Sequence, residues 1–482
     1  MTVDRRTFLR ISGAVPVAGL AGWPPPDDWE RLRRRLSGPL FRPGDAGYPE
    51  VKQVFFTMYD DRMPAAVVGA ACVEDVQAAI AFAARHRLPV AARSGGHSYP
   101  GYSTVDGGIV VDLSRFSGIE VRPDGRAAIG AGARLGPIAT TLAAAGRVLP
   151  AGSCDTVGIA GLALGGGVGV LDRKYGLTCD HLEAARIVTA DGRLRTVSAT
   201  AEPDLFWALR GGGGGNFGIV TGFTFRTVPV ADVATFQLYF PPAAGADLLA
   251  AWQEWQPAGP DELWSGMGLA ANEASLGGTF LGPEARLKEL LDDLIRRVGT
   301  PPIEQQRRVM DHLSAMRSFD DHDSRPGAVE ARYAYTGTSR MLTRPAADPG
   351  AVVEVLTRDP GVRTIVDSAG GAIARVGARE TAFPHRKSLA SLQFLHGAAP
   401  EDGGEAAARR SLAAVRDGLG PEFGTTGYVN YLDPEMPDWA EAYYGVNLPR
   451  LRAVARKYDP RGIFAFPQGL SAPRSTVHKG ES

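Results

Sequence analysis

Apolar and polar positions in the first half of the chain predict strands alternating with short helices. Residues 75–86 (DVQAAIAFAARH) carry apolar side chains at helical spacing and begin with an acidic residue, which predicts an amphipathic helix. Apolar runs on either side of it, at 65–73 and 88–92, predict strands, and a third apolar run follows at 109–113. This part of the chain is therefore expected to begin as a strand–helix–strand unit.

The same pattern predicts further elements up to residue 230. A strand is expected over 126–133 and a helix over 135–145. Residues 184–197 (AARIVTADGRLRTV) predict a hairpin with Asp191-Gly192 at its turn, a dipeptide that suits a tight hairpin. A last strand is expected over 222–228, after a run of five glycines that is either a flexible loop or a close approach of backbone to a ligand.

The pattern changes between residues 231 and 425. Helical spacing over 284–298 and 405–419 alternates here with strand-like runs. The strand-like runs are 264–270, 331–336 and 389–395. This alternation predicts an α+β domain, an antiparallel sheet with helices on one face. A further amphipathic helix is expected over 448–458.

The bulk composition is that of an ordinary globular protein. The chain has 482 residues, enough for two or three domains, and 44% of them are hydrophobic. Its 52 basic and 53 acidic residues nearly cancel, which argues against nucleic acid or an anionic membrane as the main partner. No apolar run after Ala21 approaches the length of a membrane span. We expect a small-molecule substrate instead, and no metal site is predicted.

The N-terminus has the features of an export signal. Arg5-Arg6 precede a short, mildly apolar run from Ile11 to Ala21. This order fits a twin-arginine signal cut near Ala21, and a basic tail is the alternative. Residues 1–35 are therefore expected to be signal and linker, ending in a short basic helix, and the mature protein is expected to be exported.

Residues 151–182 (AGSCDTVGIAGLALGGGVGVLDRKYGLTCDHL) form the most unusual stretch of the chain. Seven glycines lie between Gly152 and Gly169 in an otherwise apolar run. Bare backbone can come close to another group, and its N–H groups can cradle a phosphate. A set of tight turns in a chain with 60 glycines is the alternative.

A second glycine loop, residues 93–98 (RSGGHS), follows the expected strand 88–92. An arginine beside bare backbone is a second candidate anion cradle. Of the three cysteines, Cys72 is expected to be buried and inert in the strand 65–73, and Cys179 to be structural. Cys154, in a loop, is the candidate for chemistry.

The segments ARSGGHSYPGYS and GSCDTVGIAGLALGGGVGVLDRKYGLTCDHL, in this order and spacing, resemble the berberine-bridge-enzyme-like flavoprotein oxidases of the vanillyl-alcohol-oxidase superfamily. The resemblance runs from about Arg62 to Gly469. It implies an α+β fold with a two-part FAD-binding domain of the PCMH type over 40–230 and an α+β substrate domain with an antiparallel sheet over 231–425. A C-terminal segment over 426–475 is expected to return to the FAD domain.

The resemblance also implies FAD attached twice, through His97 to the 8α-methyl group and through Cys154 to ring carbon 6. Asp155 departs from the family, which often carries proline there, and its carboxylate is expected to raise the thiol pKa. Val157 matches a position where a smaller apolar residue goes with oxygen access, which favours an oxidase. The remaining implied cofactor contacts are Arg93, Ser94, Gly95, Gly96, Ser98, Gly161, Gly165, Gly166, Gly167, Gly218, Val220 and Asn447.

Removal of hydride from an alcohol carbon requires a base for the hydroxyl proton. In similar enzymes the first Tyr of Tyr-X-Asn-Tyr lies beside flavin N5, so Tyr428 is the expected base and Tyr431 the second choice; plain walls of an apolar pocket are the alternative. A tyrosine pKa of ~10 must be lowered by a cation or strong hydrogen bonds for this role. Gln393 is expected to orient substrate or flavin. The pair His385-Arg386 is either a substrate contact or, with more weight, a structural hinge.

These features together predict an exported FAD-linked oxidase. An alcohol, a sugar hydroxyl or an activated C–H of a natural product would give hydride to the covalent flavin. O2 would then take the electrons from the flavin and be released as hydrogen peroxide. Two alternatives stay open: a dehydrogenase of the same fold with another electron acceptor, and a flavin-binding protein without catalysis. The pattern argues against a nicotinamide dehydrogenase, because the run from Gly165 to Gly169 does not sit between a strand and a helix with an acidic residue ~20 positions on.

Overall fold

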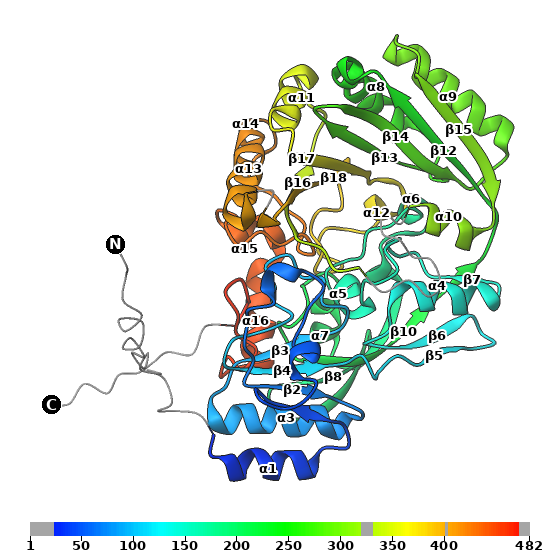
Figure 1. Cartoon of the computed structure of the whole chain (residues 1–482). Coiled ribbons are helices and arrows are strands. Elements are labelled where there is room, and N and C mark those ends of the chain that lie inside the picture. Colours follow the sequence, from blue (N-terminus) through cyan, green and yellow to red (C-terminus); the bar gives the residue numbers. More distant parts are fainter. Residues whose placement is uncertain (1–23, 320–330, 401–402, 472–482) are drawn as a thin grey trace, which may run out of the picture.

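The computed structural model describes residues 24–319, 331–400 and 403–471. The expected export signal, residues 1–22, lies outside these residues. The fold is mixed α and β (Figure 1), with a small mixed sheet, a five-stranded antiparallel sheet and a large antiparallel sheet that all contribute to one cavity. None of the helices in the described ranges is long and apolar enough to cross a membrane.

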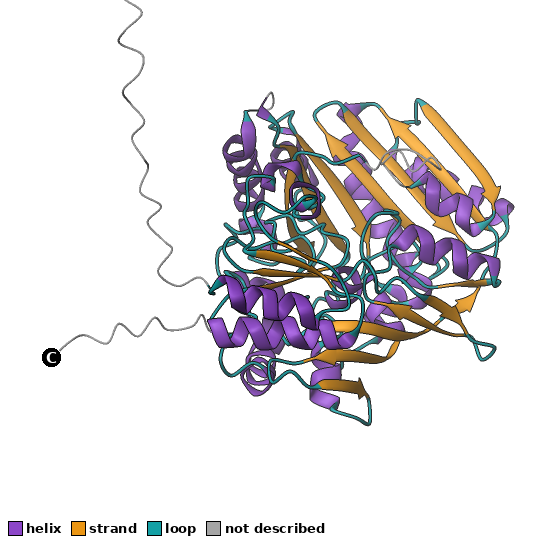
Figure 2. Cartoon of the chain, turned by 60° about the horizontal axis from the view of Figure 1, so that its bottom comes forward, coloured by secondary structure: helices purple, strands orange, loops and turns teal. Residues whose placement is uncertain are grey.

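The first sheet has four strands in the order β1-β2-β4-β3, with β2 and β3 parallel to β4. The crossover between β2 and β3 is the predicted helix α3, so the expected strand–helix–strand unit is confirmed. Helix α1 packs along α3 through the rings of Trp29 and Phe82, and Figure 2 shows the two helices side by side. The elements are α1 (Pro26–Arg35), β1 (Leu40–Phe41), β2 (Ala66–Gly69), α3 (Val73–His86), β3 (Val90–Arg93) and β4 (Ile109–Asp112).

The strand expected over 65–73 is shorter than predicted. It ends at Gly69 because the buried carboxylate of Asp75 accepts hydrogen bonds from the N–H groups of Ser37, Gly38 and Ala71 at 2.8–2.9 Å. Burial raises the pKa of Asp75, but these hydrogen bonds outweigh it and the pKa is lowered. Cys72 is therefore not inside a strand: it is the N-cap residue of α3 and is half-buried.

The second sheet has five antiparallel strands in the order β5-β6-β10-β8-β9. The predicted hairpin is its β8–β9 pair, and a two-stranded β7–β11 ribbon joins it to the next domain. The elements are β5 (Ile119–Val121), β6 (Arg126–Gly130), α4 (Leu135–Ala144), β7 (Arg147–Val148), α5 (Ile159–Leu164), β8 (Leu182–Val188), β9 (Leu194–Ser198), α7 (Pro203–Ala208), β10 (Ile219–Arg226) and β11 (Val228–Pro229).

The large sheet has seven antiparallel strands in the order β15-β12-β14-β13-β17-β18-β16. Helices cover one of its faces, and the other face looks toward the first two sheets (Figure 1). The strands are β12 (Val233–Phe240), β13 (Leu263–Ala270), β14 (Glu273–Phe280), β15 (Glu304–Met310), β16 (Tyr335–Leu342), β17 (Val362–Ser368) and β18 (Ala390–Gly397); the covering helices are α8 (Gly245–Ala258), α9 (Glu284–Val298), α11 (Pro349–Thr357) and α13 (Gly404–Gly418). The apolar stripe of α9, which predicted the helix, is buried in this layer.

The strand expected over 331–336 is wrong for its first four residues, because β16 begins at Tyr335. The preceding segment bonds to the N-terminal part of the chain instead. Arg332 donates to the Val54 carbonyl at 2.8 Å and pairs with Asp60, and the Tyr333 carbonyl accepts from the Thr57 N–H at 2.9 Å.

The C-terminal segment returns from the large sheet to the first domain. Helix α16 (Leu448–Tyr458), predicted with these bounds, lies against α7, and the Leu470 N–H donates to Asn216 Oδ1 at 2.9 Å. The remaining short elements are α2 (Tyr48–Val51), η1 (Thr57–Tyr59), α6 (Asp172–Tyr175), η2 (Thr178–His181), η3 (Pro242–Ala244), α10 (His312–Ser318), α12 (Gly371–Arg375), α14 (Gly420–Phe423), α15 (Trp439–Tyr444) and η5 (Gly445–Asn447).

Candidate active site

One cavity of about 1250 Å³ lies between the two glycine loops, the face of the large sheet that helices leave open, and the C-terminal segment. It exceeds the roughly 300–1,000 Å³ usual for a small-molecule site. Its wall contains most of the residues singled out above: Ser94, Gly95, Gly96, His97, Ser98, Cys154, Val157, Gly161, Gly218, Val220, Gln393, Tyr428 and Tyr431.

His97 and Cys154 come together through a shared neighbour. Thr156 Oγ1 lies 2.9 Å from His97 Nε2 and 3.6 Å from Cys154 Sγ. The imidazole ring stacks on Phe55, with centroids 3.8 Å apart and planes 21° from parallel. Two side chains separated by more than fifty residues are thus held in one part of the wall.

The loops that carry these two residues touch through glycine. A Cβ on Gly95 would lie 2.3 Å from the Gly158 nitrogen, and one on Gly158 would lie 2.1 Å from Ser94 Oγ. Ser94 Oγ is itself fixed by a 2.7 Å hydrogen bond to the Ala131 carbonyl. A Cβ on Gly161, in contrast, would meet nothing within 4 Å, so bare backbone here faces open cavity.

Arg93 does not take the place expected for it. Its guanidinium pairs with Asp112 at 2.7 Å and donates to the carbonyls of Val51, Lys52 and Gln53, so it points away from the cavity and is nearly buried. Because these partners occupy the side chain, we correct its role from an anion contact to an anchor for the segment before Phe55.

Gly165, Gly166 and Gly167 also lie behind the wall. A Cβ on Gly165 would lie 1.9 Å from Asn430 Oδ1, and Gly166 and Gly167 have φ angles of +128° and +84°. The Gly167 N–H donates to Tyr428 Oη at 2.8 Å. This run therefore positions the tyrosine end of the cavity rather than lining it.

Asn447 likewise lies outside the cavity wall. Its side-chain amide donates to the carbonyls of Ala378, Thr381 and Ala382 at 2.7–3.2 Å. It joins the C-terminal segment to the loop before β18. The side chain therefore does not face the cavity, where a contact with cofactor or substrate was expected.

Two donors converge on the Tyr428 hydroxyl: the Gly167 N–H and the Asn430 amide, both at 2.8 Å. The Asn430 amide is held by the Leu162 carbonyl at 2.9 Å. Burial raises the pKa of Tyr428 although both hydrogen bonds lower it. Tyr431 lies edge-on to Tyr428, with ring centroids 4.9 Å apart, and Gln393 donates to Tyr99 Oη.

Asp367, on β17, is a site residue that sequence reasoning missed. It lines the cavity, and burial raises the pKa of its carboxyl from 3.8 to about 7. Burial is also the main reason why the pKa of Tyr431 is raised, with the Asp367 charge second. The signal was present as an acidic residue inside an apolar strand, T-I-V-D-S. A group that titrates near neutral pH in a cavity is a candidate for proton transfer.

Several glycines lie on the face of the large sheet that helices leave open, and this surface is called the glycine floor below. Gly266, Gly268 and Gly277 line the cavity, and polar side chains lie flat over two of them. A Cβ on Gly268 would lie 2.2 Å from Glu273 Oε1, and one on Gly277 would lie 2.2 Å from Gln237 Oε1. Trp264 also lines the cavity, and its buried indole N–H has no hydrogen-bond partner within the described ranges. The floor is shallow, with hydrogen-bonding groups along it.

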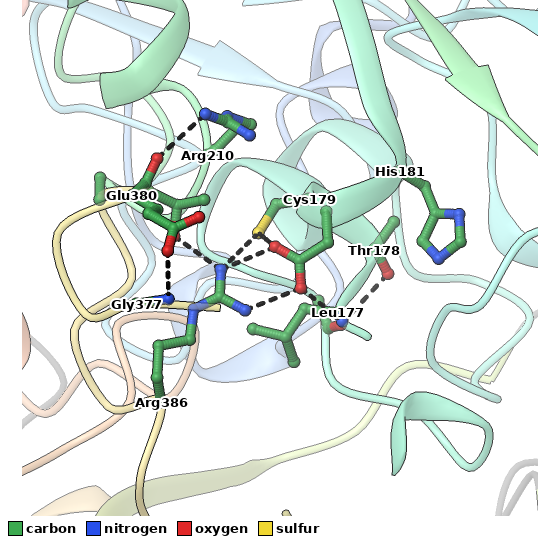
Figure 3. Close-up of polar contacts among 12 residues, drawn as sticks. Leu177, Thr178, Cys179, His181, Arg210, Gly377, Glu380 and Arg386 are labelled. Atoms are coloured by element: carbon green, nitrogen blue, oxygen red, sulfur yellow. Dashed lines mark hydrogen bonds and ion pairs between the residues drawn. The ribbon is translucent and has the colours of Figure 1, made fainter. Parts of the chain in front are cut away.

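A buried ion pair holds the domains together beneath the cavity. Arg386 is fully buried and donates to both oxygens of Asp180 at 2.7 Å and to Thr381 Oγ1 at 2.6 Å. Figure 3 shows its guanidinium directed at the segment that carries Cys179. Burial raises the pKa of the Cys179 thiol. These contacts favour the structural role for Arg386.

The same segment holds the glycine run in place. The Cys179 N–H donates to the Gly166 carbonyl at 2.8 Å, and the Thr178 N–H donates to the Gly167 carbonyl at 3.0 Å. The ion pair Arg386–Asp180 is thus connected through backbone to the donor of the Tyr428 hydroxyl. No cluster of potential metal ligands is found among the residues that the structure describes.

Comparison with known proteins identifies the family. Residues 64–198 match the model of an FAD binding domain, and residues 427–471 match the berberine and berberine-like model. An FAD-linked oxidoreductase of Bacillus subtilis is 33% identical over 459 residues, covering 92% of this chain and 99% of the relative. The chain belongs to the berberine bridge enzyme-like family of FAD-linked oxidoreductases.

Two further members of this family are sugar oxidases. The chitooligosaccharide oxidase of Gibberella zeae is 31% identical over 446 residues, covering 86% of this chain and 89% of that enzyme. The structure of glucooligosaccharide oxidase from Acremonium strictum has a TM-score of 0.82 and 27% identity, covering 91% of this chain and 98% of that one. Its FAD is described as 6-S-cysteinyl, 8α-N1-histidyl. The expected fold class, the FAD cofactor and the oxidoreductase activity of this chain are confirmed.

Proposed function

We propose that this protein is an oxidase of carbohydrate hydroxyl groups that carries FAD attached through His97 and Cys154. The observation that carries the proposal is the shared contact of these two side chains with Thr156 in the wall of the cavity. The glucooligosaccharide oxidase with its doubly attached FAD, and the chitooligosaccharide oxidase, support both parts.

The residues around His97 fit a flavin dinucleotide. Bare backbone at Gly161 faces open cavity, and Ser94, Gly95, Gly96 and Ser98 bring a hydroxyl and N–H rich loop to the same wall. Such groups suit a pyrophosphate. Gly218 and Val220 line the wall where the nucleotide would continue, and Val157, which also lines the cavity, would control oxygen access. When bound, FAD supplies the acceptor for the hydride of the substrate carbon and passes the electrons to O2, which gives hydrogen peroxide.

The glycine floor of the large sheet suits a sugar. A sugar ring carries hydroxyl groups around its edge, and the floor offers carboxylate, amide and hydroxyl groups from Glu273, Gln237 and Ser275. Trp264 also lines this part of the cavity and offers an aromatic surface beside the floor. We therefore place the sugar between this floor and the tyrosine end of the cavity.

At the tyrosine end of the cavity, the hydroxyl proton of the substrate would be transferred to a nearby carboxylate. Oxidation of an alcohol breaks the C–H and O–H bonds and leaves C=O, so the hydroxyl proton must reach a base. Asp367, with its pKa raised to about 7 by burial, can accept a proton near neutral pH, whereas burial keeps both tyrosines protonated. Tyr431 would pass the proton to Asp367, and Tyr428, held by two donors, would orient the hydroxyl group. Gln393, through Tyr99, fixes the side of the site facing Tyr431.

Acid precipitation tests the flavin attachment. The holoenzyme pellet should stay yellow for the wild type, lose colour partly in His97→Ala and in Cys154→Ala, and lose it fully in the double variant. A screen of neutral oligosaccharides with peroxide detection then tests the substrate class. A wild-type pellet that releases all of its flavin would overturn the covalent attachment. Covalent flavin without oxidation of any sugar would overturn the substrate class alone.

We also propose that the protein is exported through the twin-arginine pathway. The proposal rests on Arg5-Arg6 and the mild apolar run after them, which lie outside the described residues. Replacing both arginines by lysine should retain the protein in the cytoplasm, because the pathway reads the guanidinium pair. Unchanged export of the lysine variant would exclude this route.

A further inference from the structure

Strand β15 forms one end of the large sheet, and among the residues that the structure describes no further strand pairs with its outer edge. The strand order ends at β15, and Figure 1 shows it as the last strand on that side. All seven of its residues are exposed or half-buried. Ile303, directly before it, is 71% exposed, and Val309 is 55% exposed. Such an edge presents alternate backbone N–H and C=O groups to a further strand.

The sequence of this edge complements itself. Residues 303–309 read I-E-Q-Q-R-R-V. When a second copy is laid antiparallel about Gln306, Glu304 faces Arg308 and Ile303 faces Val309. The two-fold axis produces each of these pairs twice. Opposite charges and apolar pairs across neighbouring strands stabilise a sheet, and like charges in those places destabilise it.

The two kinds of pair lie on different faces of the sheet. Side chains alternate along a strand, so Glu304 and Arg308 share a face with Gln306, and Ile303 and Val309 share the other. The register with β12 puts Gln306 beside Gln237, which lines the cavity, so the charged pairs lie on the cavity side. The apolar pairs then lie on the helix side.

Other registers lose this match. An axis at Arg307 would set two guanidinium groups against each other. An axis at Gln305 would bring Glu304 opposite Gln306 and Ile303 opposite Arg307. The sequence therefore singles out the axis at Gln306.

We propose that the partner of this edge is a second copy of the chain, paired antiparallel through β15 about Gln306, so that the two large sheets become one. Two seven-residue strands are ~23 Å long and form a contact smaller than the roughly 1,200–2,000 Å² of a standard interface. We expect reversible dimers with a dissociation constant on the order of micromolar.

Charge reversal tests the pairing directly. Glu304→Arg places Arg against Arg308 of the second copy, and Arg308→Glu places Glu against Glu304. Each single variant should raise the dissociation constant at least tenfold in light scattering on a sizing column. The double variant, which exchanges the two charges, should restore the dimer. The two single variants mixed together should form a heterodimer. Glu354→Arg, on the exposed surface of α11, is the matched control for the charge change and should dimerise like the wild type.

A disulfide at the axis gives a second readout. Gln306→Cys should form a disulfide-linked dimer under mild oxidation, because the two Cβ atoms face each other at the axis. Gln305→Cys, whose side chain faces Arg307 of the partner, should not. Monomeric wild type at about 100 μM, or a dimer that both single reversals leave unchanged, overturns the proposal. So does capture of a foreign extended peptide by β15 in place of the second copy. Sugar oxidation should stay at the wild-type level in all these variants, because none of the changed residues lines the cavity.

Discussion

Replacing Asp367 by asparagine should make the protein more stable above neutral pH and slower as an enzyme. Burial raises the pKa of this carboxyl from 3.8 to about 7. Between these two values the folded protein holds a proton that the unfolded chain has lost. Stability contributed by this group is therefore complete below pH 3.8 and falls as the pH rises toward 7.

The size of the effect follows from the same shift. Each pH unit between 5 and 7 removes about 1.4 kcal/mol of unfolding free energy, so the wild type should lose about 2.7 kcal/mol over this range through Asp367. The amide of the Asp367→Asn variant does not titrate, so the variant should lose none of it. The value is an upper figure because the side chain faces the cavity, where water can screen its charge.

Urea unfolding of the holoenzymes at pH 5, 6, 7 and 8, followed by circular dichroism, measures this difference. The gap between Asp367→Asn and wild type should widen with pH and level off above 7. Asp292→Asn, on the exposed surface of α9, controls for the loss of one carboxylate. A gap that stays constant within about 0.5 kcal/mol from pH 5 to 8 would refute the burial of a protonated carboxyl. The variant should also reduce its flavin more slowly than wild type, without the rise in rate near pH 7.

Three further changes probe the architecture around the cavity. Arg386→Met should cost about 3–5 kcal/mol of stability by leaving Asp180 without its partner, and the Arg386→Met, Asp180→Leu double variant should recover part of it; equal melting temperatures for wild type and Arg386→Met would contradict the anchoring role. Gly158→Ala should lower stability by about 1–3 kcal/mol and reduce the flavin absorbance per chain, because its Cβ would lie 2.1 Å from Ser94 Oγ. Gly118→Ala, whose Cβ would meet nothing within 4 Å, should do neither, and similar flavin content in the two would speak against contact between the loops. Asn430→Ala should slow flavin reduction about tenfold in stopped flow, the equivalent of one hydrogen bond of about 1.4 kcal/mol, and an unchanged rate would show that the Tyr428 hydroxyl needs only the Gly167 donor.

Local pattern predicted the elements well where a helix carried its own apolar stripe. The helices Glu284–Val298 and Leu448–Tyr458 have the predicted bounds because their periodicity, and in the second case the following Asp-Pro, are written in adjacent residues. The strand expected to contain Cys72 is shorter because Asp75, several residues on, takes the Ala71 N–H. The apolar run in the sequence looks the same whether or not a later side chain takes one of its backbone N–H groups, so the pattern alone could not predict the earlier end of the strand.

Only the site residues that lie in recognisable sequence motifs could be predicted. His97, Cys154, Tyr428 and Tyr431 lie in recognisable segments, and the structure brings them to one cavity. Arg93 lies in such a segment too, but its direction depends on Asp112 and on carbonyls about forty residues away. Asp367 was missed because its place in the wall follows from pairing with β13 and β18, which local sequence does not reveal.

The C-terminal segment makes catalysis depend on the end of synthesis. Tyr428 and Gly167 form their hydrogen bond across 261 residues of sequence, and Leu470 bonds to Asn216 across 254. A chain synthesised only as far as residue 427 has neither Tyr428 nor Tyr431 for the wall of the cavity. With the tyrosine roles proposed above, such a chain would not oxidise substrate. A ribosome that stops before residue 428 would leave a protein that contains the sequence of every described strand but lacks the C-terminal part of the cavity wall.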